Sequence, residues 1–444
     1  MKNFFNIIKT APTIPQKNHE QLLRENYRYW RTRVLYTTTI GYAVFYLVRK
    51  GLSTAQPIIE KEFGFDKWQL GLILTLTGIA YGVSKFINGF AGDKTNPRYF
   101  MFLGLIGSAI INVFFGLSSG IIAFGIFWLL NGWFQGMGWA PCSRTLVQWF
   151  ATKERGIKFS ICNCAVSIGG ASVMFLNGYL IKHYDWEYCF FIPAGIAVIG
   201  SLFILERLRD RPQSLGLPPV EEYYGDATDM QNAKAGDQTP YLDVVMKYMF
   251  REPMMWILCF ANFFVYVIRY SIFDWGTTFL KECKGLEVSD GSWMMGGYEL
   301  AGVAGMLLGG LIMDRIFRGY GGKACAIYMV LCSLFLVEFW LLPVYSIWAN
   351  VIMLCSIGFL IYGPQCLIAV IAANMVPKNA GAAAVGFTGL FGYLSTSLSG
   401  LGLGIIVDYF GWSGGFLMLI ISGAIGTVLF LILWNTGVLR VNHS

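Results

Sequence analysis

Long apolar segments separated by short polar loops follow one another along almost the whole chain. Twelve of them have nearly the ~20 residues that an α-helix needs to cross the hydrocarbon layer of a bilayer. Glycines recur within these segments, and small residues allow helices in a membrane to approach closely. The pattern predicts an all-α membrane protein with twelve transmembrane helices. The predicted spans cover residues 34–56, 69–91, 99–117, 121–142, 158–181, 187–206, 254–280, 293–313, 323–343, 347–373, 381–407 and 413–436.

The spans divide into two repeated halves. The second span ends in Gly89-x-x-x-Asp93-Lys94, and 221 residues later the eighth ends in Gly310-x-x-x-Asp314-Arg315. Parallel repeats of six spans, with a site between them, describe a major facilitator fold. We therefore expect three parts: a six-helix half with a basic start at 1–206, a polar cytoplasmic linker at 207–248, and a second six-helix half at 249–444.

Composition and charge agree with a membrane protein. The chain is 55% hydrophobic and 13% charged, whereas soluble proteins contain about 25% charged residues. Lysines and arginines gather at the start of the chain and in the loops after spans 2, 4, 6 and 8. The positive-inside rule then places both termini in the cytoplasm, with the protein in the cell inner membrane. The net charge of +7 follows from this loop bias, so we expect no nucleic-acid partner.

Other chemistry has little support in the sequence. The ten cysteines show no metal-ligand spacing and are interpreted as small apolar side chains. The three histidines lie outside the predicted spans. No acid–base or nucleophile pair converges outside the spans, and no phosphate-binding loop of an ATPase is found. We therefore expect no enzyme activity, no cofactor and no metal, and a monomer in the bilayer.

Two arginines lie deep inside apolar segments at equivalent positions of the halves. Arg269 follows Arg49 by 220 residues. At ~1.5 Å of rise per helical residue, Arg49 is ~24 Å from Arg33, its nearest charged neighbour upstream. An arginine at that depth costs roughly 2.5–3.5 kcal/mol on insertion scales. Because guanidinium binds phosphate or carboxylate oxygens in a bidentate manner, two such residues predict an anion-binding site.

Hydroxyl and amide side chains share helix faces with these arginines. Tyr42 and Tyr46 precede Arg49 at helical spacing, and Tyr266 precedes Arg269 in the same way. Together with a third cation, Lys85, such side chains predict one aqueous cavity. Its expected lining is Tyr42, Tyr46, Tyr81, Asn163, Tyr266, Tyr362, Gln365 and Tyr393.

A structural role for the arginines is the alternative. A buried arginine can pair with a buried acid, and Asp274 and Glu299 are the candidates. A tyrosine in a span can equally pack against a neighbour or anchor the helix at the interface. Asp93, Asp314 and Arg315 lie at predicted cytoplasmic turns, where we expect conformational latches rather than ligand contacts.

The chain resembles the organophosphate:phosphate antiporters of the major facilitator superfamily over nearly its whole length. The resemblance is carried by Gly41-Tyr-Ala-Val-Phe-Tyr-Leu-Val-Arg-Lys50, Tyr81-Gly-Val-Ser-Lys85-Phe, Asn131-Gly-Trp-Phe-Gln-Gly-Met-Gly-Trp-Ala-Pro-Cys142, Gly216-Leu-Pro-Pro-Val-Glu-Glu222 and Gly386-Phe-Thr-Gly-Leu-Phe-Gly-Tyr393. It implies that Arg49 and Arg269 hold the phosphate with Lys85 nearby. It also implies that Lys50, Asp274 and Glu299 belong to an ion-pair network of the outer gate.

One departure bears on the substrate. Glycerol-3-phosphate transporters have a histidine after Asn-Cys-Ala in the fifth helix, where this chain has Val166. Arg24-x-x-Tyr-Arg-Tyr-Trp30, Leu208-Arg-Asp-Arg-Pro-Gln213 and Gly363-Pro-Gln365 resemble the bacterial hexose-phosphate branch and its sensors. We expect exchange of a hexose 6-phosphate, such as glucose 6-phosphate, for inorganic phosphate. Glycerol-3-phosphate exchange, a membrane sensor of sugar phosphate and proton-coupled symport through Asp274 or Glu299 remain alternatives.

Overall fold

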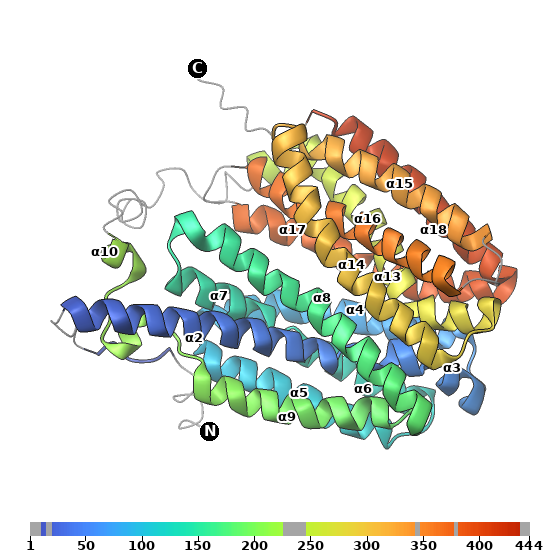
Figure 1. Ribbon diagram of the computed structural model, residues 1–444, viewed down its shortest axis with the longest axis horizontal. Coiled ribbons are helices and arrows are strands. Elements are labelled where there is room, and N and C mark those ends of the chain that lie inside the picture. The colour runs from blue at the N-terminus through green and yellow to red at the C-terminus, as the bar shows by residue number, and fades with distance from the viewer. Residues whose placement is uncertain (1–9, 15–19, 225–245, 342–346, 377–380, 436–444) are drawn as a thin grey trace. The chain divides into compact units, whose positions relative to one another are not determined.

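Every regular element in the part of the chain that the structure describes is a helix (Figure 1). The structure is a computed structural model, and it describes residues 10–14, 20–224, 246–341, 347–376 and 381–435. Each of the twelve predicted spans falls, in its described part, on one to three helical segments. Within the described residues, eight continuous helical stretches are long and apolar enough to cross a membrane. The expectation of an all-α membrane protein is confirmed.

Several predicted spans consist of two or three consecutive helical segments. The first span is interrupted near its middle, the fourth is divided into two helices, and the eleventh runs through a short π-helix into the last helix. In that last helix Gly411, with φ 67°, separates the eleventh span from the twelfth. The helices before the linker are α2 (Glu20–Leu47), α3 (Gly51–Phe63), α4 (Lys67–Lys94), α5 (Pro97–Gly116), α6 (Ile121–Gln135), α7 (Trp139–Trp149), α8 (Thr152–His183) and α9 (Tyr188–Arg207).

Two short helices lie in the described start of the linker, η1 (Pro212–Leu215) and α10 (Val220–Tyr224). Residues 225–245 of the predicted linker lie outside the described residues. The later helices are η2 (Met246–Phe250), α13 (Pro253–Lys284), α14 (Val288–Leu311), η3 (Ile312–Ile316), α15 (Gly321–Leu341), α16 (Ile347–Asn374), α17 (Gly381–Leu394), η5 (Ser397–Gly402) and α18 (Leu403–Ile432).

The chain folds into two compact units. Unit 1 contains residues 1–51, 80–173 and 187–236, and unit 2 contains residues 52–79, 174–186 and 237–444. Unit 2 therefore includes α3 and the first part of α4, although both precede the linker. The division of the sequence into halves at 1–206, 207–248 and 249–444 stays a prediction.

Unit 1 is built around α5, which packs against α6, α7 and α9, while α2 packs against α7 and α9. Aromatic rings fill part of its core: the Phe115 centroid is 4.8 Å from that of Trp128 and 4.5 Å from that of Phe190. The start of the linker is fixed to this unit through Asp210. Its carboxylate pairs with Arg144 at 3.2 Å and accepts the Ala11 N–H at 3.0 Å.

In unit 2, α14 packs closely against α16 because glycines line the contact. A Cβ placed on Gly305 would lie 1.9 Å from the carbonyl oxygen of Phe359, and one on Gly302 would lie 2.6 Å from the Tyr362 ring. Only glycine allows backbones to approach so closely. This contact brings Tyr362 of α16 next to Glu299 of α14.

An ion network joins α3, α4, α13 and α18 within unit 2. Lys67 Nζ lies 2.5 Å from a Glu60 oxygen and 3.0 Å from a Glu282 oxygen. Asp408 accepts the backbone N–H groups of Lys67 and Trp68 at 3.2 and 2.7 Å. Its charge therefore lies at the positive end of the α4 dipole. One lysine thus compensates two carboxylates, while the helix end holds the third.

Replacing Lys67 by methionine should destabilise unit 2. The variant leaves Glu60 and Glu282 near each other without their cation, which should cost ~1–2 kcal/mol because the side chains keep some exposure to solvent. We expect a lower melting temperature in detergent. Lys61→Met, a change at an exposed lysine on α3 next to Glu60, is the control and should leave the melting temperature unchanged.

The effect of Lys67→Met should depend on pH. Burial raises the pKa of Glu60 above its ordinary value, and Lys67 beside it opposes that shift. A carboxyl with a raised folded pKa binds more protons in the folded state, so stability falls as pH rises through that pKa. Without Lys67 the pKa rises further. The gap in melting temperature from wild type should therefore be narrow at acidic pH and wide at alkaline pH; a gap independent of pH would contradict the network.

Candidate functional site

The first predicted span is interrupted at Arg49. Helix α2 ends at Leu47 and α3 begins at Gly51, so Val48, Arg49 and Lys50 form a non-helical turn between them. The sequence pattern predicted one continuous helix here, and the break is a correction to it. A break within an apolar span exposes backbone groups that helical hydrogen bonds would otherwise satisfy.

Two buried asparagines satisfy the backbone at this break. The amide nitrogens of Asn112 on α5 and Asn131 on α6 both donate to the carbonyl oxygen of Val48, each at 2.9 Å. Both asparagines are fully buried. An unpaired buried carbonyl costs ~1–3 kcal/mol, so the amides stabilise the turn that places Arg49. Their position in the middle of apolar spans is the signal from which sequence reasoning could have found this role.

Arg49 is surrounded by tyrosines in unit 1. Its guanidinium carbon lies 3.8 Å from the ring centroid of Tyr81 and 5.2 Å from that of Tyr46. The Tyr42 ring lies 5.7 Å from that of Tyr46. Lys85 is half-buried, and its Nζ lies 6.0 Å from the centroid of Trp139, which in turn packs on Tyr42 at 5.1 Å. The structure therefore brings together the predicted tyrosines and Arg49, with Lys85 on the same helix as Tyr81.

Arg269 occupies a different setting in unit 2. It lies in the uninterrupted helix α13 and is 7% exposed. Its Nη2 donates to the Tyr362 hydroxyl at 3.1 Å, and the Tyr362 hydroxyl donates to a carboxylate oxygen of Glu299. The rings of Tyr266 and Tyr362 lie 5.6 and 4.7 Å from its guanidinium carbon. The predicted contact between Arg269 and an acid thus runs through a tyrosine.

Tyrosine rings stabilise both cations, of which Arg269 is buried and Arg49 is half-buried. A cation over an aromatic face gains about 0.5–2 kcal/mol, while tyrosine hydroxyls can also accept hydrogen bonds from guanidinium. The Nε of Arg269 is buried, and the described residues provide no hydrogen-bond partner for it. Both arginines therefore combine a fixed guanidinium plane with donors that can bind anion oxygens.

The remaining predicted cavity residues differ in how deeply they are buried. Gln365 is half-buried on α16, and its Oε1 has no hydrogen-bond partner among the described residues. Tyr393 is half-buried on α17, and Asn163 is exposed on α8. Asn262, one turn before Tyr266, donates to the Thr388 carbonyl at 2.7 Å and so joins α13 to α17. Their part in a common cavity stays a prediction.

Comparisons with known proteins agree on one family. The family model for the Major Facilitator Superfamily matches residues 38–400. The chain belongs to this superfamily. It is 41% identical to the "Glycerol-3-phosphate transporter" of Bacillus subtilis over 97% of this chain and 98% of that protein. It is 36% identical to the "Probable hexose phosphate transport protein" of Chlamydia pneumoniae over 95% of each chain.

A sensor is also among the relatives of this superfamily member. The "Membrane sensor protein UhpC" of Escherichia coli is 37% identical over 96% of this chain and 97% of that protein. Among solved structures, a bacterial homolog of the human lysosomal transporter Spinster matches with a TM-score of 0.74 and 15% identity, covering 92% of this chain and 97% of the other. That likeness supports the major facilitator fold. The predicted family is confirmed, and these relatives are transporters and a sensor rather than enzymes.

The predicted gating residues of this major facilitator protein lie in different settings, and their roles stay predictions. Asp274 is buried and accepts the Ser53 hydroxyl of α3 at 2.9 Å, a contact within unit 2. Glu299 accepts the Tyr362 hydroxyl, and its role in a gate stays a prediction. Lys50 lies in the turn beside Arg49. Arg315 is exposed, and the side chains of Asp93 and Asp314 lie outside what the structure describes.

Sequence reasoning missed the Lys67 network as a candidate gate. The mixed signs of Glu60-Lys61-Glu62 and Lys281-Glu282 were a signal, because opposite charges on neighbouring loops can pair. In the structure Lys281 also donates to the Pro57 carbonyl at 3.2 Å. The segments that follow Arg49 and Arg269 in the chain are therefore linked within unit 2 by several polar contacts.

Replacing both Asn112 and Asn131 by leucine should lower stability and phosphate affinity by more than the sum of the two single changes. Each single variant leaves Val48 one amide donor, whereas the double variant leaves none, so the losses should be non-additive by about 1 kcal/mol or more. The measurement is a double-mutant cycle on melting temperature and on phosphate affinity. Gln135→Met is the control. Gln135 is a buried amide on α6, the helix of Asn131, and it donates to the Ser108 hydroxyl instead of to Val48. Simple additivity in both readouts would contradict the role.

Proposed function

We propose that the protein is an antiporter that takes up a phosphorylated organic substrate in exchange for inorganic phosphate. The observation that carries this proposal is the pair of arginines, 220 residues apart, each surrounded by tyrosines inside a predicted apolar span. Transporters of glycerol phosphate and hexose phosphate among the relatives support it. Arg49, Arg269 and Lys85 are proposed to bind the phosphate group.

Electrostatics explains why such a site favours exchange. Closing an empty cavity around these cations removes them from water at a large cost. A phosphate dianion compensates the charges and lowers the barrier to closure. Because the organic phosphate and inorganic phosphate share this group, either can accompany the return step. Obligatory exchange follows, without need for ATP.

A hexose 6-phosphate is our proposed organic substrate. Its free hydroxyls need partners once water is excluded, and the chain offers Asn163, Tyr362, Gln365 and Tyr393 in helices near the predicted site. The unpaired buried oxygen of Gln365 suits a sugar hydroxyl donor. Glycerol 3-phosphate is the second candidate, because the Bacillus subtilis relative named for it is 41% identical.

The orientation and the gate complete the proposal. Loop charge supports cytoplasmic termini in an inner membrane. The Lys67 network and the Ser53–Asp274 contact then lie toward the outer side, where they are proposed to act in the outer gate with Lys50 and Glu299. Asp93, Asp314 and Arg315 are proposed as latches on the cytoplasmic side. A sensor role, supported by the UhpC relative, is the alternative in which binding persists but exchange is weak.

Arg49→Lys and Arg269→Lys should each abolish phosphate exchange while expression stays normal. Lysine keeps the charge but loses the planar fork, which should weaken phosphate binding by about tenfold or more. The measurement is exchange of labelled phosphate by purified protein in phosphate-loaded liposomes. Arg251→Lys, a change at an exposed arginine, is the control. Near wild-type exchange by either variant would remove that arginine from the site, and uptake without internal phosphate would favour proton-coupled symport.

Glucose 6-phosphate should compete for phosphate exchange better than glycerol 3-phosphate does. Gln365→Ala should then weaken competition by glucose 6-phosphate, by about fivefold for one lost hydrogen bond, and leave inorganic phosphate nearly unchanged. Competition curves with the three anions test both statements. Equal losses for all three anions would make Gln365 a structural residue. A wild-type preference for glycerol 3-phosphate would replace the hexose with the second candidate.

A further inference from the structure

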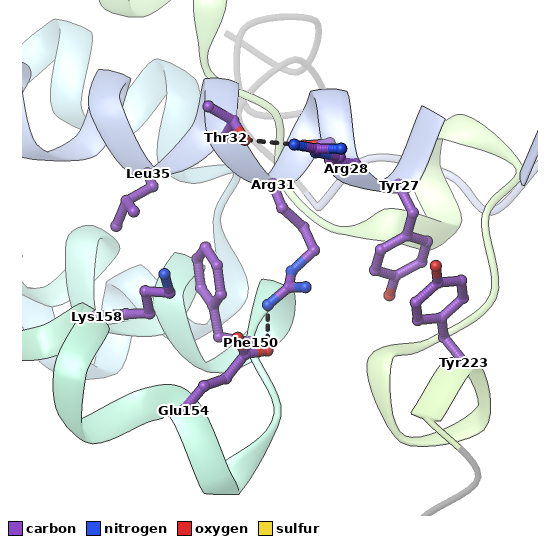
Figure 2. Close-up of a pocket in the computed structure, with 9 residues that line it drawn as sticks. All are labelled: Tyr27, Arg28, Arg31, Thr32, Leu35, Phe150, Glu154, Lys158 and Tyr223. Carbon is purple, nitrogen blue, oxygen red and sulfur yellow. Dashed lines mark hydrogen bonds and ion pairs between the residues drawn. The ribbon is translucent and has the colours of Figure 1, made fainter. Parts of the chain in front are cut away.

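A second basic site lies in unit 1, apart from Arg49. It is a pocket of about 220 Å³, shown in Figure 2, between α2, the start of α8 and α10. We propose that this basic pocket binds a phosphate group, carried either by a soluble phosphate compound or by an anionic lipid. Its lining is Tyr27, Arg28, Arg31, Thr32, Leu35, Phe150, Glu154, Lys158 and Tyr223.

One wall of the basic pocket is an aromatic stack. The rings of Tyr27 and Tyr223 are parallel within 6°, with centroids 4.0 Å apart. Tyr27 is fully buried, and its hydroxyl donates to the Pro218 carbonyl at 3.2 Å. These contacts fix the linker residues around α10 against α2. The wall is therefore built by tertiary contacts, rather than by two mobile surface chains.

Arg31 is held in place within the lining of the basic pocket. Its Nε donates to the Trp149 carbonyl at 3.2 Å, and its two terminal nitrogens contact the Tyr224 hydroxyl and the Glu154 carboxylate. Figure 2 shows the Arg31 side chain directed toward Glu154. A cation fixed in this way loses little conformational entropy when it contributes to binding an anion.

The basic pocket has an excess of positive charge. Arg28, Arg31 and Lys158 carry three cations, and Glu154 is the single carboxylate of its lining and already pairs with Arg31. Within the described part of the chain, Lys158 Nζ has only a ring contact, 5.6 Å from the Phe150 centroid. Within the part of the chain that the structure describes, Arg28 and Lys158 therefore have no carboxylate at ion-pair distance. They match a phosphate group, which carries up to two negative charges near neutral pH.

The helix that begins at the basic pocket strengthens its preference for an anion. Helix α8 begins at Thr152 and runs for 32 residues. Its amino-terminal end carries a partial positive charge, which favours anions. The orientation proposed above places the pocket at the cytoplasmic membrane surface, where soluble phosphate compounds and lipid headgroups are both present.

The transport mechanism does not use these residues. Tyr27 and Arg28 belong to the Arg24–Trp30 segment, and Tyr223 follows Gly216–Glu222; both stretches contribute to the family resemblance without lining the proposed cavity. A ligand here would join α2, which leads to the turn at Arg49, to α8 and to the linker.

Protection of Lys158 from acetylation tests the basic pocket directly. The full-length protein is placed in nanodiscs of neutral lipid, treated with an amine-acetylating reagent with and without inorganic phosphate, and digested for mass spectrometry. We expect about fivefold slower acetylation of Lys158 with phosphate, and slower acetylation also when the neutral lipid is replaced by phosphatidylglycerol. Lys182, an exposed lysine near the other end of the same helix, is the internal control and should not change.

The variants separate the basic pocket from the transport site. Arg28→Gln should reduce the protection, whereas Arg269→Lys should leave it intact, so failure of the proposed transport function would not affect the result.

Protection by inorganic phosphate identifies a soluble ligand, and protection in anionic nanodiscs alone identifies a lipid headgroup. The proposal is overturned by no protection in either case, by equal protection from chloride at the same ionic strength, or by full protection in Arg28→Gln. It is also overturned if phosphate protects only after Asp226, Asp229 and Asp237 are changed to asparagine, because the occupant is then the chain's own acidic segment.

Discussion

Holding a guanidinium group inside an apolar segment is the constraint on which much of this structure depends. The two units meet it differently. In unit 2 the helix stays continuous, and a chain of hydrogen bonds from Arg269 through Tyr362 to Glu299 compensates the charge. In unit 1 the helix itself is interrupted at Arg49, and tyrosine rings cover the cation. Arg49 and Arg269 occupy equivalent positions of the sequence repeat, but their local backbone and their contacts differ.

Each solution depends on support from helices that are distant in sequence. The Arg269 chain requires α14 and α16 to be close enough for Tyr362 to reach Glu299, and glycines such as Gly305 allow that approach. The Arg49 turn requires a carbonyl to be satisfied without a helical partner, and Asn112 and Asn131 supply the amides. In both units, small or polar residues in the middle of apolar spans position the cation without touching it.

Two polar networks outside the arginine sites also compensate their charges, and the basic pocket differs from them. Around Lys67 and Asp210, each buried or half-buried charge has a counter-charge or a backbone donor. In the basic pocket the cations outnumber the acid. An uncompensated charge in a rigid, concave setting indicates a ligand, because folding alone gains nothing from gathering like charges.

The sequence by itself determined the membrane class, the superfamily and the two arginines, because apolar length and isolated charges are properties of local segments. It also indicated Tyr42, Tyr46 and Tyr266, since helical spacing places them on known faces. Tertiary structure alone decided the break at Val48, the route from Arg269 to Glu299 through Tyr362, and the joining of α2, α8 and α10 around the basic pocket. These depend on contacts between residues up to about two hundred positions apart, and neither periodicity nor composition records which side chain will satisfy which partner once the helices pack.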